Sequence, residues 1–116
     1  MWNVEFSADA EHDFELIFDH LVDSYIGFGE EIDEALEHAV DRLRGIRSTT
    51  HKLGLAPHQG TIRADIATGI RFVRLDKTVF WFDLDEQRQV VRVLAVFFGS
   101  QDHIRHMLTR ALAASS

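Results

Sequence analysis

The 116-residue sequence contains no cysteine and no long hydrophobic run, and each absence excludes a class of protein. Without cysteine there can be no disulfide, which fits a reducing compartment such as the cytoplasm. No apolar run approaches the roughly 20 residues that a membrane-spanning helix needs, and no basic-then-apolar leader opens the chain. We therefore expect a cytoplasmic protein that does not associate with a membrane.

Positive charge is scarce in the first half of the chain. Residues 1–59 hold 13 Asp and Glu against 4 Lys and Arg, whereas residues 60–116 hold 6 against 8. Because affinity for phosphate backbones needs clustered cations, the acidic half argues against a broad nucleic-acid-binding surface. We expect no direct DNA binding by this chain alone, and any basic site must lie in the second half.

Recognisable metal and phosphate motifs are also missing. His103 and His106 are three residues apart with Asp102 adjacent, so the two imidazoles could share a helix face. A metal site normally needs three or four ligands with supporting hydrogen bonds, so we interpret this pair as the polar flank of a helix. No Gly-rich phosphate loop follows a strand. The sequence therefore predicts neither a bound metal nor a cofactor.

The strongest structural signal is residues 78–99, in which Val, Phe, Trp and Leu occupy both alternating faces. This pattern predicts two strands, Thr78–Leu84 and Gln89–Phe98, at the centre of an antiparallel sheet. Outer strands are predicted at residues 2–6, 61–66 and 70–75, with a turn at residues 67–69 and a tight connection at residues 76–77.

Two amphipathic helices are predicted after the first strand. Ser7 is placed to cap the first helix, and Glu30 and Glu31 open the second. The short break at residues 26–29 predicts an antiparallel helical hairpin that covers one face of the sheet. The apolar residues predicted to dock this hairpin are Phe14, Ile17, Phe18, Leu21, Leu36, Val40 and Leu43.

The remaining segments complete a single α+β domain over residues 1–116. The pattern weakens from Ser48, and residues 53–60 are predicted to be a loop that enters the sheet. A short C-terminal helix starts at Ser100, and the end at residues 113–116 is expected to fray. Because this helix is too short to cover the second sheet face, we expect an exposed apolar or mixed surface there, which a partner-binding protein would need.

Five cations lie on or beside the predicted strands of the second half: Arg63, Arg71, Arg74, Lys77 and Arg92. One interpretation is that they pair with carboxylates on the same strands, namely Asp65, Asp76, Asp83 and Glu86. The other is a functional basic patch that faces an acidic partner or nucleic acid, since arginine binds carboxylates and phosphates through two parallel hydrogen bonds. We predict that these cations, together with Trp81, form the rim of a partner-binding surface.

Several short motifs follow one another in a fixed order: Ala56-Pro57-His58-Gln59-Gly60, Arg63-Ala64-Asp65-Ile66, Gly69-Ile70-Arg71, Trp81-Phe82-Asp83, Val91-Arg92-Val93-Leu94 and Gly99-Ser100-Gln101-Asp102-His103. Together with the predicted element order, they resemble the RelE/ParE family of toxins from type II toxin–antitoxin systems over nearly the whole chain. The resemblance implies a bacterial cytoplasmic toxin of the plasmid-stabilization type that inhibits growth. It also implies a cognate antitoxin whose extended C-terminal segment wraps and neutralises the toxin.

The resemblance implies one of two activities. RelE-like members cleave mRNA on the ribosome without a metal, whereas ParE-like members poison DNA gyrase. For a nuclease, Arg71 matches the family's Gly-x-Arg position and His103 lies near where a histidine would act, but the only tyrosine, Tyr25, belongs to a helix stripe. The few cations and the acidic charge favour the ParE-like branch, with gyrase as the target and no assigned catalytic residue. The alternatives are a RelE-like endonuclease that uses Arg71 and His103, and an inactive member that binds only its antitoxin.

Overall fold

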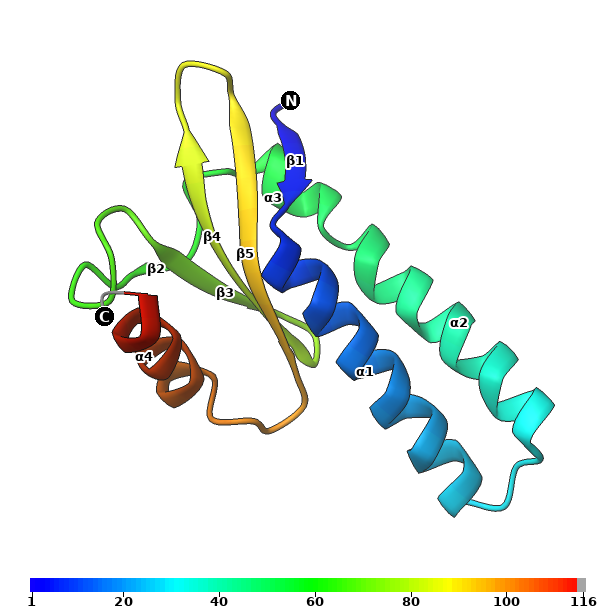
Figure 1. Ribbon diagram of the computed structural model, residues 1–116. Coiled ribbons are helices and arrows are strands. Elements are labelled where there is room, and N and C mark those ends of the chain that lie inside the picture. The colour runs from blue at the N-terminus through cyan, green and yellow to red at the C-terminus, as the bar shows by residue number, and fades with distance from the viewer. Residues whose placement is uncertain (115–116) are drawn as a thin grey trace.

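The computed structural model describes residues 1–114, which form an α+β fold around one five-stranded sheet (Figure 1). The strand order is β1-β5-β4-β3-β2. The strands are β1 (Asn3–Phe6), β2 (Thr61–Ile62), β3 (Arg71–Leu75), β4 (Thr78–Asp85) and β5 (Val90–Phe98). The helices in the described range are α1 (Ala8–Gly27), α2 (Ile32–Ser48), α3 (His51–Leu55) and α4 (His103–Ala114).

The predicted centre of the sheet is confirmed. β4 and β5 pair antiparallel over their whole length, and most of their apolar side chains are buried because both faces are covered. β1 adds to the free edge of β5 in parallel, with Asn3 opposite Val90 and Phe6 opposite Val93. The sheet is therefore mixed, and the consecutive strands β2 to β5 form an antiparallel meander.

The helical hairpin is confirmed, but its docking differs from the prediction. The Ser7 hydroxyl accepts a hydrogen bond from the Ala10 N–H and caps α1, which packs on β5. α2 packs mainly against α1, and the hairpin extends beyond the sheet (Figure 1). The prediction that Leu36 and Val40 pack on the sheet is therefore wrong, because both side chains are exposed.

Two segments of the predicted loop and outer strand are also corrected. Residues 53–55 of the predicted loop belong to α3 instead, and Gly54 lies so close to the Trp2 carbonyl that a Cβ would collide with it. The predicted strand over residues 61–66 is reduced to Thr61–Ile62. It ends there because the chain turns at Arg63, whose carbonyl accepts hydrogen bonds from the N–H groups of Ile66 and Ala67.

The second face of the sheet is covered more completely than predicted. The apolar side chains on this face gather with Met107 of α4 in a buried cluster. We expected an exposed apolar or mixed surface here, and this expectation is wrong for Val79, Trp81 and Phe97, which are buried. The predicted fraying at the C-terminus falls partly on residues 115–116, which lie outside the described residues, whereas residues 113–114 belong to α4.

Candidate functional site

The first candidate site lies where α4 begins, on the sheet face that α4 covers. The indole Nε1–H of Trp81 donates a hydrogen bond of 3.1 Å to Nδ1 of His103, and the Phe72 ring packs edge-on against the imidazole. Because Nδ1 accepts this bond, the imidazole is neutral and its proton is on Nε2. The structure therefore holds His103 in one tautomer and one orientation.

The surroundings of His103 keep it neutral. Partial burial lowers the pKa of His103 below its ordinary value of 6.5, and positive charge from Arg74 and, more weakly, Arg63 lowers it further. Arg74 donates a 3.3 Å hydrogen bond to the Gly99 carbonyl just before α4. Asp102 acts in the opposite direction and Arg63 is paired with Asp65, so Arg74 supplies the unbalanced positive charge beside the neutral imidazole.

Arg63 and Arg92 are engaged by neighbouring carboxylates, as the first interpretation of the cations predicts. Arg63 donates hydrogen bonds of 2.9 and 2.7 Å to Asp65, and Arg92 donates bonds of 2.7 and 2.8 Å to Asp83. The hydrogen bonds raise the pKa of both arginines, and the bond from Arg63 lowers the pKa of Asp65. These arginines therefore carry little unbalanced charge.

Arg71 lies apart from His103. Its Nη1–H donates a 2.8 Å hydrogen bond to the His58 carbonyl, and its Nε is buried without a hydrogen-bond partner in residues 1–114. Side chains alternate along a strand, and the next residues show the sides: Phe72 packs with the α4 cluster, whereas Val73 packs with the hairpin cluster. Arg71 and His103 therefore lie on opposite faces of the sheet, and Arg71 holds the loop at residues 58–59.

The other predicted partner-binding residues are dispersed. Lys77 is exposed in the turn between β3 and β4, where its carbonyl accepts a 2.8 Å hydrogen bond from the Gly99 N–H. The Trp81 side chain is 0% exposed, so no partner can contact it while α4 keeps this position. The structure thus brings Arg63, Arg74 and His103 together and separates them from Arg71.

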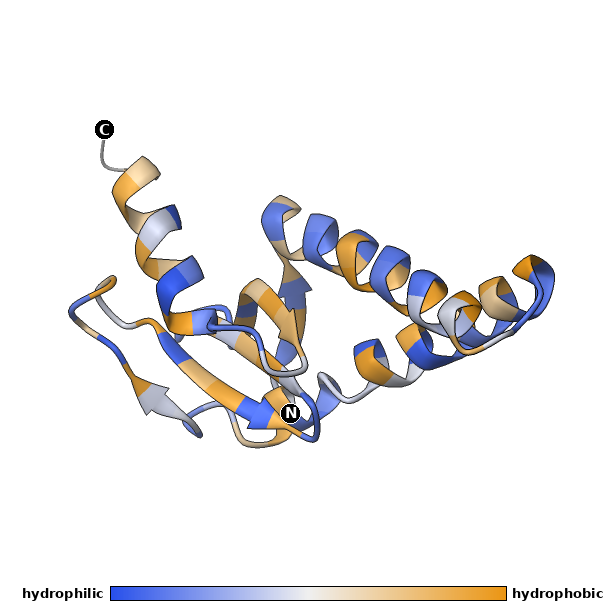
Figure 2. Cartoon of the chain, turned by 90° about the horizontal axis from the view of Figure 1, so that it is seen from below, coloured by the Kyte–Doolittle hydropathy of each residue, from blue (hydrophilic) through white to orange (hydrophobic). Residues whose placement is uncertain are grey.

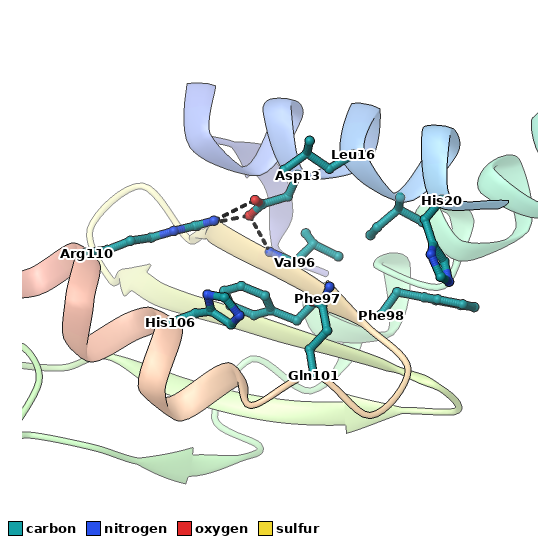
Figure 3. Close-up of a pocket in the computed structure, with 10 residues that line it drawn as sticks. Asp13, Leu16, His20, Val96, Phe97, Phe98, Gln101, His106 and Arg110 are labelled. Atoms are coloured by element: carbon teal, nitrogen blue, oxygen red, sulfur yellow. Dashed lines mark hydrogen bonds and ion pairs between the residues drawn. The ribbon is translucent and has the colours of Figure 1, made fainter. Parts of the chain in front are cut away.

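A second site, which the sequence analysis missed, lies between α1 and α4 (Figure 3). The Asp13 carboxylate is only 3% exposed and accepts hydrogen bonds of 2.7 and 3.1 Å from Arg110 and 2.9 Å from the Val96 N–H. β1 ends opposite Val93, so Asp13 supplies the acceptor that a neighbouring strand would otherwise give to Val96. The hydrogen bond to Asp13 raises the pKa of Arg110.

A cleft of about 140 Å³ opens beside this ion pair and is lined by residues of α1, β5 and α4. His106 stacks on the Phe97 ring, and the Arg110 guanidinium lies 5.0 Å from the centre of the same ring (Figure 3). The arrangement fastens α4 to the hairpin and to the edge of β5. The signal for it was an aspartate at buried helical spacing between Ala10 and Ile17.

Two general features of the described residues bear on function. No three His, Asp or Glu side chains among residues 1–114 are grouped so that they could hold a metal ion. Within the same range, no helix combines the length and the apolar content that crossing a membrane requires.

Solved structures of toxin–antitoxin systems share this fold. A chain of the chromosomal ParDE toxin–antitoxin system from P. aeruginosa is 19% identical and superposes with a TM-score of 0.62, covering 86% of this chain and 98% of that chain. The isolated E. coli RelE toxin is 8% identical, with a TM-score of 0.51 and coverage of 97% and 99%. A chain of the intact E. coli RelBE toxin–antitoxin complex is also 8% identical, with a TM-score of 0.51 and coverage of 87% and 100%.

Comparisons of sequence find no such likeness. No protein-family model matches the chain, and no curated protein matches it significantly. The structural likeness nevertheless shows that the chain has the RelE/ParE-type fold, as its sequence resemblance predicted.

Proposed function

We propose that this chain is the toxin of a type II toxin–antitoxin module and that a cognate antitoxin neutralises it in the bacterial cytoplasm. The observation that supports this most is the shared fold, which extends over 86% of this chain for the ParDE system and 97% for RelE. One of the similar structures is a toxin–antitoxin complex, which supports a protein antitoxin as the partner.

We infer further that the toxin is ParE-like and inhibits growth by binding DNA gyrase. Cleavage of RNA without a metal needs a base, an acid and cations that stabilise the developing charge. Here Arg71 and His103 lie on opposite sheet faces, and Arg63 and Arg92 are paired with carboxylates. Tyr25 is stacked on His38 far along the hairpin, away from these residues. This dispersal favours inhibition by protein–protein binding over catalysis.

The decisive experiment compares two targets with one protein preparation. Induced expression should arrest growth, and co-expression of the neighbouring antitoxin gene should restore it. The purified protein should then inhibit supercoiling by gyrase, while primer extension on a message translated in vitro shows no new ends. Codon-positioned cleavage with unaffected supercoiling would overturn the ParE-like assignment.

A RelE-like endonuclease is the second candidate, and the geometry of His103 favours it. The Trp81 hydrogen bond holds this imidazole neutral, and the charges of Arg74 and Arg63 reach it. As held here, the imidazole can donate a hydrogen bond from Nε2–H to a phosphate oxygen, and it can act as a base only when Nδ1 releases the Trp81 N–H. If this candidate is correct, message cleavage will be lost in Arg74→Ala and largely retained in Arg71→Ala, because Arg71 is on the other face.

In this proposal the partner-binding surface is formed by the basic residues on and beside the strands in the second half of the chain. Arg74 and Lys77 are its exposed, unpaired cations within the described chain, and Arg63 and Arg92 can exchange their present carboxylates for those of a partner. An inactive member would bind its antitoxin through the same surface without arresting growth. Binding without growth arrest would therefore identify the third alternative.

A further inference from the structure

The outer face of α2 carries a row of apolar side chains, Ile32, Leu36, Val40 and Leu43, which we call the α2 stripe. Ile32 is 53% exposed, Leu36 is 38% exposed and Val40 is 37% exposed, whereas Leu43 is partly buried. Spacings of four, four and three residues place the four side chains on one side of the helix. Ile32, Leu36 and Val40 remain exposed on this side, whereas Leu43 packs towards the core cluster.

The stripe is exposed because a different row of α2 residues packs against the rest of the protein. Ala35, Ala39 and Ile46 are buried and form the side that packs towards α1 and the core. The hairpin extends away from the sheet (Figure 1), and orange residues alternate with blue ones along both hairpin helices (Figure 2). A helix that serves only the fold would carry polar residues on such a side.

Shallow grooves continue the stripe on both sides. Leu43 lines a groove between the two helices together with Phe18, Glu15 and Asp19 of α1. Leu36 and Val40 line a second hollow with Glu37 and Asp41 on the outer side of α2. The apolar surface therefore has carboxylates along both of its edges, with Arg47 lining the first groove and Arg44 the second towards the C-terminal end of α2.

The charge of the hairpin is mostly negative. Residues 8–41 contain twelve Asp and Glu residues and no Lys or Arg. Asp19, Asp33 and Glu37, which flank the stripe, make no ion pair with any residue of the described chain. The C-terminal part of α2 carries three arginines: Arg44 contacts Asp41, Arg47 bonds to Glu11, and Arg42 lies over the Phe98 ring. The surface around Ile32, Leu36 and Val40 is therefore mostly negative.

We propose that the α2 stripe is the docking site for a basic amphipathic helix of a partner protein. Apolar residues of that helix would pack on Leu36 and Val40, and its Lys or Arg residues on both edges would meet the carboxylates of α1 and α2. Residues 32–43 form a straight row about 17 Å long, which suits the mode in which a helix lies in an apolar groove. This inference goes beyond the proposed toxin activity and does not depend on it.

A second copy of this chain is a poor occupant of the same site. If two stripes packed face to face, Asp33 and Glu37 of one copy would approach the acidic flanks of the other. Like charges brought together at an interface oppose association. Charge complementarity therefore selects a basic partner.

The proposal can be tested with the full chain and three synthetic peptides. One peptide forms an amphipathic helix with leucines at positions i, i+4 and i+7 flanked by lysines, the second carries glutamates in place of the lysines, and the third scrambles the lysine peptide. Fluorescence anisotropy should detect binding of the lysine peptide alone, with an affinity that falls as salt is raised.

Variants locate the binding site on the hairpin. Leu36→Ser should weaken binding of the lysine peptide about tenfold, because a central apolar contact is lost. Asp19→Lys combined with Glu37→Lys should weaken binding and reduce its dependence on salt. Leu55→Ser removes a leucine that is 63% exposed on α3 and should leave the affinity unchanged.

Three results would overturn the proposal. Equal binding of the lysine peptide and its scrambled form would mean general attraction to an acidic protein. An unchanged affinity in Leu36→Ser would place the peptide elsewhere. Concentration-dependent dimerisation that Leu36→Ser abolishes, without peptide binding, would make a second copy the occupant. Growth arrest by the same variants is scored separately, so a failed toxin assay does not affect this test.

Discussion

Replacing Arg110 with alanine should destabilise the fold by leaving the Asp13 carboxylate without its cation. Asp13 is 3% exposed and would keep only the hydrogen bond from the Val96 N–H. Breaking a buried ion pair by removing one partner costs about 3–5 kcal/mol. Because the Arg110 side chain is 34% exposed beside an open cleft, water can partly replace it, and we expect a loss of about 2–4 kcal/mol.

Urea unfolding followed by tryptophan fluorescence measures this loss, since Trp81 is fully buried in the native state. Adding Asp13→Asn to Arg110→Ala should recover part of the stability. The neutral amide needs no cation, and its oxygen can still accept the Val96 N–H. The double variant should therefore be more stable than Arg110→Ala alone. This result would show that the single variant is destabilised by the unpaired Asp13 carboxylate.

Arg105→Ala is the matched control, because Arg105 lies on the same helix, is exposed and makes no side-chain ion pair within residues 1–114. Its effect should stay within about 0.5 kcal/mol. A loss below about 1 kcal/mol for Arg110→Ala, or a double variant less stable than the single one, would refute the idea that this pair fastens α4.

Three further predictions concern pH, backbone packing and binding. Since the pKa of folded His103 is below 6.5, the unfolded chain binds the proton more readily, so stability should fall as pH drops below about 6.5. NMR titration of the imidazole checks the pKa, and the loss of stability below about pH 6.5 should be smaller in His103→Gln. Gly54→Ala should lower the free energy of unfolding by about 1–3 kcal/mol, because the new Cβ collides with backbone atoms. Gly45→Ala has open space around the new Cβ and should raise the free energy of unfolding by about 0.5–1 kcal/mol. Urea unfolding measures both changes. Arg74→Glu combined with Lys77→Glu should weaken antitoxin binding at least about tenfold and reduce its salt dependence; unchanged affinity in calorimetry would remove this rim from the interface.

The sequence predicted the elements whose signals are local. β4 and β5 were recognisable because apolar residues occupy both faces of two adjacent runs. α1 was recognisable from its cap at Ser7 and from an apolar stripe with helical spacing. In such cases neighbouring residues in the chain carry the whole pattern, so no distant contact is needed to interpret it.

The same local patterns could not tell which surface a stripe packs against. The apolar rows of α2 look alike in sequence, yet Ala39 is buried against the core side while Leu36 faces solvent. The difference arises because α1 lies between α2 and most of the sheet. Helical α3 was missed because its short segment is held by contacts with the first strand instead of by a periodic pattern.

The candidate sites depended on tertiary structure even more strongly. The sequence supplied Arg71 and His103 as a pair, but strand alternation and the position of α4 put them on opposite faces of the sheet. Asp13 and Arg110 are 97 residues apart and became partners only because α4 crosses back beside α1. Chain spacing determines which residues share a face of one element, whereas contacts between elements follow from how the whole chain packs.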